Sequence, residues 1–372
     1  MLNKPQGYDL LLLLLVVALT SFGVVMIYSA SSVMAAKKFN DGAFFLKRQG
    51  LYAVVGFVVL AITMRVDYRF WQKMAPPMLV LSLLLLFAVL FPAVGGSVKG
   101  ASRWIKLPFM NLQPAEFAKI SLVIYMAHSV TKKQDRLKQL TAGFIPYMII
   151  LAVLVMLLLK QPDLGSAATL AAITMSILFV AGTRFMFVIG SALVAAPIVG
   201  FLVYTSAYRW KRILAFLNPE QDPTGIGWQI TQSRYAFGAG GLLGQGLGEG
   251  KQKMFYLPEA HTDFILAVIG EELGLIGVLV IVAMFFVLVQ RAVKIATNTS
   301  EPFGRFLAFG IATLFAIQSI VNMGVATGAF PTKGLALPFL SYGGSSLLVS
   351  MFATGILLNI SAGSSGVKKR QN

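Results

Sequence analysis

The chain has 372 residues, of which 57% are hydrophobic and only 12% are charged. Soluble globular domains carry roughly a quarter charged residues, so this composition excludes an ordinary soluble fold and predicts an all-α integral membrane protein. In a chain this apolar, the formal net charge of +17 indicates contact with anionic lipid or an anionic substrate, and we expect no nucleic acid partner.

The chemistry open to the chain is limited by its residue types. It contains no cysteine, and its two histidines are His128 and His261. This excludes disulfides, thiol nucleophiles and metal cages built from Cys or several His side chains. Any catalysis must therefore come from carboxylates, amines and hydroxyls, and we predict no protein metal site.

Apolar runs, separated by Pro, Gly and charged residues, predict about ten transmembrane helices. They are expected near residues 10–28, 47–64, 77–95, 114–130, 143–159, 165–182, 185–205, 264–289, 305–328 and 343–361. Residues 206–262, between the seventh and eighth helices, are predicted to form one large extracytoplasmic loop. The chain, 1–372, is thus a single polytopic membrane domain that ends in a short cytoplasmic tail, 362–372.

Orientation depends on where Lys and Arg lie. An even number of spans puts both termini on one side, and the two sides carry equal numbers of basic residues until the long loop is left out. Loops approaching ~60 residues weigh little in the positive-inside rule. The basic residues of this loop are Arg209, Lys211, Arg212, Arg234, Lys251 and Lys253. Without them the terminal side is the more basic, so both termini are predicted to be cytoplasmic.

A charged pair lies inside the fourth predicted span. Pro114 suits the first turn of a helix, which puts Glu116 and Lys119 on one face within the membrane. Each charge at that depth costs on the order of 3 kcal/mol unless it is paired or faces a cavity. The pair is either a structural ion pair between helices or part of a polar cavity for a substrate head group. We favour the cavity, because two ionisable groups are a heavy cost merely to join helices.

Two further segments combine small and polar residues. Asp163, at the start of the sixth predicted span, is typical of a helix cap. Ser341 lies in the segment 331–346, whose glycines and serines indicate either a polar site or close helix packing.

The strongest candidate active site lies where the long loop ends. Asp263 stands at the start of a predicted helix, Glu271 follows on the same helical face, and His261 precedes them. Asp263 could equally be a helix cap. Acids and a histidine that converge at a membrane surface beside a basic loop nevertheless make the best catalytic candidates in the chain.

Six short motifs occur in a fixed order over nearly the whole chain. They are Lys99-Gly-Ala-Ser-Arg-Trp104, Gln113-Pro-Ala-Glu-Phe-Ala-Lys119, Gln161-Pro-Asp-Leu-Gly165, Pro258-Glu-Ala-His-Thr-Asp-Phe264, Gly270-Glu-Glu-Leu-Gly274 and Ser341-Tyr-Gly-Gly-Ser-Ser346. On these motifs the chain resembles the SEDS family (shape, elongation, division, sporulation). Residues 258–272 resemble the FtsW branch of that family more than the RodA branch, in which Arg is expected in place of Ala260.

The resemblance implies a peptidoglycan glycosyltransferase that polymerises lipid II at the outer face of the cytoplasmic (inner) membrane during septal cell-wall synthesis, with Asp263 essential. It also implies a class B penicillin-binding protein transpeptidase of the FtsI type as partner, other divisome membrane proteins similar to FtsQ, FtsL and FtsB, and a location at the division septum. Some family members carry Arg two residues before the second motif, where this chain has Asn111. A phosphate contact assigned to that Arg cannot be transferred.

The expected mechanism uses Asp263 as general base on the 4-hydroxyl of the acceptor sugar while the polyprenyl pyrophosphate of the growing glycan leaves. The leaving group would be stabilised by Lys119, Arg209 and Arg212, or by a divalent cation, Mg²⁺ or Mn²⁺. No other cofactor is expected. The residues predicted to bind substrate are Glu116, Lys119, Arg209, Arg212, His261, Glu271 and Ser341.

Other functions stay open at this point. A lipid II flippase or transporter would depend on the intramembrane pair Glu116 and Lys119, whereas a scaffold that recruits the transpeptidase would tolerate the loss of both. A RodA-like elongation polymerase would use the same catalytic residues in a different process.

Overall fold

The computed structural model describes residues 7–92, 95–98, 101–106, 111–221, 225–254, 256–332 and 334–367. Helices make up nearly all of the regular structure, which confirms the predicted all-α membrane class. In chain order the longer elements are α1 (Leu10–Phe39), α2 (Phe44–Arg65), α3 (Tyr68–Ala88), β1 (Gly95–Val98), β2 (Ala101–Lys106), β3 (Asn111–Leu112), α4 (Pro114–Lys132), α5 (Ile145–Lys160), α6 (Leu164–Val180), α7 (Phe185–Tyr204), α8 (Ala207–Leu217), α9 (Ile226–Gly240), α10 (Ile265–Asn298), α11 (Pro302–Ala326) and α12 (Gly344–Val367). Three single-turn helices, η1 (Gln134–Arg136), η2 (Leu140–Phe144) and η3 (Pro219–Gln221), complete the set.

Every predicted span overlaps one helix. Eight helices of the described chain are long and apolar enough to cross a membrane. The other two predicted spans fall on α4 and on α6, a shorter apolar helix of 17 residues. That the chain is a multi-pass membrane protein is thus confirmed, while the count of ten crossings stays a prediction.

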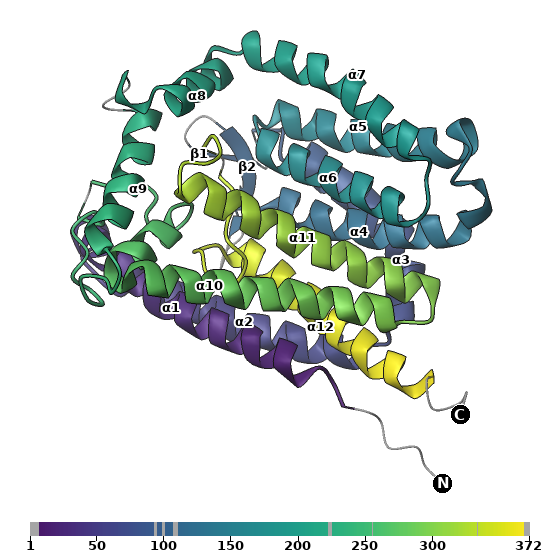
Figure 1. Ribbon diagram of the computed structural model, residues 1–372, viewed down its shortest axis with the longest axis horizontal. Coiled ribbons are helices and arrows are strands. Elements are labelled where there is room, and N and C mark those ends of the chain that lie inside the picture. Colours follow the sequence, from purple (N-terminus) through teal and green to yellow (C-terminus); the bar gives the residue numbers. More distant parts are fainter. Residues whose placement is uncertain are drawn as a thin grey trace.

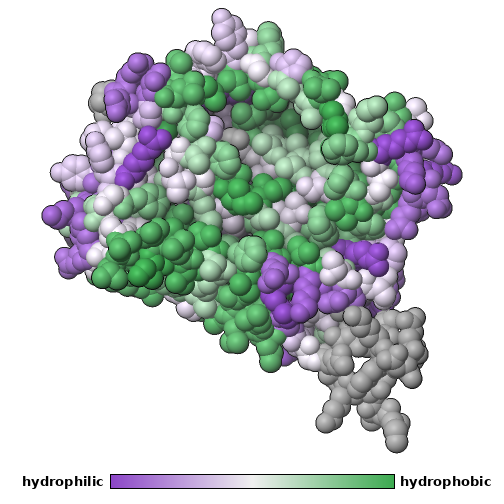
Figure 2. All heavy atoms as spheres, viewed as in Figure 1, coloured by the Kyte–Doolittle hydropathy of each residue, from purple (hydrophilic) through white to green (hydrophobic). Residues whose placement is uncertain are grey.

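The helices run side by side along the long axis of the molecule, as Figure 1 shows. Helices α8 and α9 lie at one end, and α1 begins and α12 ends at the other. Hydrophilic residues gather towards the two ends, and hydrophobic residues cover much of the face between them (Figure 2). Helix α7 lies along the edge of the bundle, and none of its residues is buried. An apolar helix with this exposure is expected to be covered largely by lipid.

The predicted long loop is more helical than expected, since it contains α8, η3 and α9. The short helix α8 is amphipathic: Trp210, Leu214 and Leu217 are exposed on one face, and basic residues lie between them. Apolar residues at this spacing form a helical stripe, which the high polarity of the surrounding segment concealed.

Some helix boundaries also differ from the prediction. Helix α3 was expected to begin at Pro77, but it begins after Asp67, whose carboxylate accepts a hydrogen bond from the backbone N–H of Arg69 at 2.8 Å. Pro76 and Pro77 lie inside this helix, which neighbouring helices in a membrane can tolerate. Helix α12 runs on to Val367, into the expected tail. Residues 368–372, including the basic Lys368-Lys369-Arg370, lie outside the described residues, as do Lys99, Gly100 and Lys333 of the sequence motifs.

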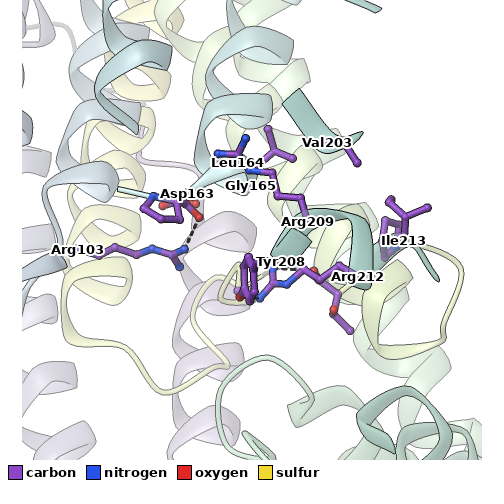
Figure 3. A pocket seen from close by; sticks show the side chains of 13 residues that line it. Arg103, Asp163, Leu164, Gly165, Val203, Tyr208, Arg209, Arg212 and Ile213 are labelled. Carbon is purple, nitrogen blue, oxygen red and sulfur yellow. Dashed lines mark hydrogen bonds between the residues drawn. The ribbon is translucent and has the colours of Figure 1, made fainter. Parts of the chain in front are cut away.

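A small antiparallel sheet joins α3 to α4, which the sequence did not predict. Strand β2 pairs with both β1 and β3, with Gly95 opposite Ile105 and Ile105 opposite Leu112. The sheet matters for function because β2 carries Arg103 to the end of the bundle where α8 lies (Figures 1 and 3).

Close backbone packing fixes the segment between α11 and α12 against α1. A β-carbon placed on Gly23 would lie 2.6 Å from the carbonyl oxygen of Phe339, a distance that no side chain tolerates. Small residues permit this approach in membrane proteins. The glycine that permits this approach belongs to α1 and not to the small residues of 331–346.

At the opposite end, Asp9 ties three helices together. Its carboxylate caps α1 by accepting from the backbone N–H of Leu12 at 3.0 Å and pairs with Arg291 of α10 at 2.7 Å. Its own N–H donates to Ser361 of α12 at 3.1 Å. The beginning of α1 and the ends of α10 and α12 therefore meet at one end of the bundle.

Candidate active site

Asp263 lies in a turn just before α10. Each backbone carbonyl of this turn accepts a hydrogen bond from a different residue. The carbonyl of His261 accepts from the N–H of Tyr342 at 2.9 Å, and that of Thr262 accepts from the hydroxyl of Ser341 at 2.6 Å. The carbonyl of Asp263 accepts from the side-chain amide of Asn322 at 3.1 Å. We call residues 261–263 the catalytic turn, after the catalytic role predicted for Asp263. It is fixed by both the 335–342 segment and α11.

The side chain of Asp263 is partly buried and is not the cap of α10. The N-cap is Phe264, and no side-chain capping hydrogen bond is formed there. The carboxylate instead lies beside Gly334: a β-carbon added to Gly334 would lie 3.4 Å from Oδ2 of Asp263. The helix-cap alternative for Asp263 is therefore wrong, and the carboxylate borders the segment that follows α11.

A pocket beside Gly334 gathers three arginines. Arg103 reaches it from β2, and Arg209 and Arg212 reach it from α8, as Figure 3 shows. The pocket encloses about 540 Å³, a volume that includes its open mouth. Its other lining residues are Pro162, Asp163, Leu164, Gly165, Val203, Tyr208, Ile213, Pro331 and Thr332.

Backbone and aromatic contacts hold the arginines in place. Arg103 donates through Nε to the carbonyl of Gln161 at 2.9 Å, and Arg209 donates to the carbonyl of Leu202 at 3.1 Å. Arg212 donates to the carbonyl of Thr332 at 3.1 Å and lies over the ring of Tyr208 at 4.6 Å. These hydrogen-bond partners, taken from the described residues, are neutral and do not cancel the charge of the three arginines, so this end of the pocket favours an anion.

Of the described residues that line this pocket, one carries a carboxylate, and that carboxylate has a structural task. Asp163 caps α6, because its carboxylate accepts from the backbone N–H of Ser166 at 3.1 Å and from the Ser166 hydroxyl at 2.8 Å. The capping role predicted for Asp163 is confirmed. Its charge is directed to the helix N-terminus, where the helix dipole favours it.

The intramembrane pair of α4 is buried. Lys119 donates to Glu116 at 2.7 Å, and the two side chains are 0% and 6% exposed. The second carboxylate oxygen of Glu116 lies 3.5 Å from the side-chain nitrogen of Gln318 on α11. Both charges belong to the same helix, so the ion pair itself does not join two helices. The link between helices is the amide of Gln318.

Comparison with known proteins shows the family of this chain. The family described as "Cell cycle protein", which comprises FtsW, RodA and SpoVE, matches residues 9–366. The chain belongs to the FtsW/RodA/SpoVE family. A curated relative from Trichlorobacter lovleyi, named probable peptidoglycan glycosyltransferase FtsW, is 70% identical over 365 residues, covering 97% of this chain and 96% of the relative.

Solved structures of the FtsW/RodA/SpoVE family share the fold. One chain comes from a study of the structural coordination of polymerization and crosslinking by a peptidoglycan synthase complex. It matches with a TM-score of 0.81 and 28% identity over 96% of this chain and 99% of that one. The rod shape determining protein RodA of Thermus thermophilus matches with a TM-score of 0.71 and 27% identity, over 96% and 97% of the two chains.

Three residues predicted to bind substrate have structural contacts in this family member. Ser341, besides its bond to Thr262, accepts from the N–H of Leu337 at 2.9 Å, so its hydroxyl holds backbone. Glu271 accepts from the backbone N–H of Lys251 at 2.7 Å. The ring of His261 is largely buried, 4.6 Å from that of Phe45. Burial also raises the pKa of the neighbouring Tyr342, so its phenol stays neutral at physiological pH.

The sequence did not single out three other contributors. Arg103 was part of a motif, but its place in the arginine pocket depends on the unforeseen sheet. Gln318 and Asn322 lie four residues apart on α11, in a mainly apolar helix. Polar residues inside a span are functional candidates by default, and that signal could have found both.

A buried ion pair near the catalytic turn was also missed. Lys253 pairs with Glu272 at 2.6 Å, and Ser29 of α1 donates to the same carboxylate at 2.6 Å. The side chains of the ion pair are 3% and 0% exposed. This cluster fastens the segment before the catalytic turn to both α1 and α10.

Glu272→Gln is expected to lower the free energy of unfolding by ~3 to 5 kcal/mol, because it leaves the ammonium of Lys253 buried without a counter-charge. The measurement is thermal unfolding of the purified protein in detergent. The matched control is Asp41→Asn, which breaks an exposed pair with Lys47 and should change stability little. Equal effects of the two changes would contradict the structural role of the buried pair.

Among the described residues, no group of three or more His, Asp or Glu side chains could hold a metal ion. The divalent cation left open by the sequence therefore has no protein cage of that kind here.

Proposed function

We propose that this chain is a peptidoglycan glycosyltransferase that polymerises lipid II into glycan strands during cell division. The observation that carries the proposal is the position of a partly buried carboxylate, Asp263, beside Gly334, which also lines a pocket with three arginines. A base next to a cationic site is what transfer from a polyprenyl pyrophosphate requires. The FtsW relatives, named peptidoglycan glycosyltransferases, support the same activity and the division role.

The reaction needs one displacement. The 4-hydroxyl oxygen of the acceptor sugar forms a bond to the anomeric carbon of the growing glycan, and the bond from that carbon to the pyrophosphate oxygen breaks. The proton of the hydroxyl passes to the carboxylate of Asp263, and the polyprenyl pyrophosphate leaves with the bonding electron pair. Attack from the face opposite the leaving group inverts the anomeric configuration.

The arginines take the role of leaving-group stabilisers. A guanidinium presents planar donors that match phosphate oxygens, so Arg103, Arg209 and Arg212 can hold the charge that develops as the bond breaks. The Nε atom of Arg212 is buried and has no hydrogen-bond partner among the described residues. Lys119 is enclosed with Glu116, so its part in substrate binding is a separate proposal.

The proposed location is the cytoplasmic membrane at the septum, with both termini inside and the α8–α9 segment outside. This orientation is supported by the basic residues on the terminal side and by the opposite ends at which the two regions lie (Figure 1). The proposed partners are a class B penicillin-binding transpeptidase and other divisome membrane proteins. The likeness to a chain from a peptidoglycan synthase complex supports the first of these.

The test is polymerisation of lipid II by the purified protein, alone and with the transpeptidase, read as glycan strands on a gel. We expect strands in at least the second reaction. Lipid II that crosses vesicle membranes without forming strands would replace the proposal with a transporter. If the protein neither forms strands nor transports lipid II, the scaffold function is the one that stays.

The arginine pocket adds a residue-level version of this test. Arg212→Ala should reduce kcat/KM by ~10 to 100-fold, since a hydrogen bond to a charged group contributes about 1.5 to 3 kcal/mol. Lys211→Ala removes the same charge from the adjacent, exposed position of α8 and should leave the rate nearly unchanged. Equal losses in both variants would indicate a general electrostatic effect and would contradict a specific site.

A further inference from the structure

The direction of the Asp263 side chain is set by the two peptide groups that flank its α-carbon. The peptide before it is held through the carbonyl of Thr262, which accepts from the Ser341 hydroxyl at 2.6 Å. The peptide after it is held through the carbonyl of Asp263 itself, which accepts from the Asn322 amide at 3.1 Å. When both planes are fixed, the bond from the α-carbon to the β-carbon has one direction.

Asn322 does this from within the helix bundle. It lies on α11 with 1% of its surface exposed, and its amide nitrogen also donates to the carbonyl of Leu335 at 2.7 Å. An amide has two N–H donors, so one side chain uses both to join the catalytic turn to the segment that carries Gly334. Asp263 and Leu335, the residue that follows Gly334, are thus held by a single side chain.

Ser341 completes the same arrangement from the other side. Its hydroxyl donates to Thr262 and accepts from the N–H of Leu337, and its side chain is buried. Asn322 and Ser341 therefore contact the backbone on either side of Asp263. Both also bond to residues 335–337, which follow Gly334 directly.

We propose that Asn322, together with Ser341, is a positioning residue that aims the carboxylate of Asp263 at the acceptor hydroxyl. This inference rests on the proposed function, because it assumes that Asp263 is the base. A general base must lie within about 2.6 to 3.2 Å of the proton it removes. A displacement of about 1 Å can cost about 100-fold in rate, so loss of either hydrogen bond lowers catalysis without removing a substrate contact.

The experiment compares Asn322→Leu and Ser341→Ala with Ser319→Ala in lipid II polymerisation. Ser319 lies on α11 close to Asn322 and is also buried, but among the described residues its hydroxyl bonds within its own helix, at the carbonyl of Phe315. We expect kcat to fall ~10 to 100-fold in the first two variants, with KM within about twofold of wild type. Ser319→Ala should retain both constants.

A fall in kcat with unchanged KM indicates a loss of positioning when the protein stays folded. Simple loss of fold instead lowers the amount of active enzyme in proportion to the loss of folded protein. Thermal unfolding in detergent reports that amount for each variant. If Asn322→Leu does not fold, Ser341→Ala decides alone, because it removes only one hydroxyl. The proposal is overturned if folded Asn322→Leu and Ser341→Ala proteins keep the wild-type kcat, or if only their KM rises.

Failure of this inference can be told apart from failure of the proposed function by including Asp263→Asn. If Asp263→Asn is inactive while both positioning variants keep the wild-type kcat, only the positioning role is wrong. If Asp263→Asn itself polymerises lipid II normally, the catalytic assignment fails, and the positioning role fails with it.

Discussion

Asp263→Asn is expected to reduce lipid II polymerisation by ~100 to 10,000-fold in a protein that remains folded, because general bases typically contribute that much. The amide keeps the size of the side chain and removes its basicity. Since α10 is capped at Phe264 without a side-chain bond, the substitution removes no cap from this helix. Initial rates of glycan formation, with thermal unfolding in the same detergent, measure the two effects separately.

The matched control is Asp67→Asn at the other end of the bundle. Asp67 caps α3 and is exposed, so the same chemical change should leave polymerisation unaffected and alter stability only slightly. An Asp263→Asn protein that polymerises lipid II at nearly the wild-type rate would end the catalytic assignment. Equal losses of activity in the two variants would point to damage that is not local to the site.

The positions of the spans and the choice of Asp263 as a candidate site residue could be predicted because both depend on local features of the sequence. Apolar runs of membrane length can be recognised without tertiary information. An acid at the end of a polar loop, within a motif that resembles the family, is a recognisable candidate site residue. The sequence could not decide whether Asp263 caps the helix that follows it. That decision depended on the exact start of α10, and helix boundaries are the least certain part of any such prediction.

The partners of the site were harder to predict, because they come together only in three dimensions. Arg103 and Arg212 are far apart in the chain and meet through a short sheet and an amphipathic helix. Ser341 was predicted to bind substrate, yet its hydroxyl bonds to the backbone. A serine in a small-residue motif looks the same in sequence whichever partner its hydroxyl finds.

The intramembrane pair shows where chemistry and folding overlap. Glu116→Gln or Lys119→Met, made singly, should destabilise the protein by ~3 to 5 kcal/mol, because each leaves one buried charge without its partner. The double variant Glu116→Gln with Lys119→Met removes both charges at similar volume and should regain most of that stability. Thermal unfolding in detergent gives this comparison.

Polymerisation by the double variant then decides what the pair does. An ion pair within α4 does not itself link two helices, so a structural role gives little reason to keep two charges at membrane depth. Lys119 has three N–H donors, and Glu116 takes one of them, so the ammonium can also serve an anionic head group. We therefore expect the stable double variant to remain ~10 to 100-fold less active than wild type, the effect of losing a hydrogen bond to a charged group. A double variant that is both stable and fully active would show that the pair serves only the fold.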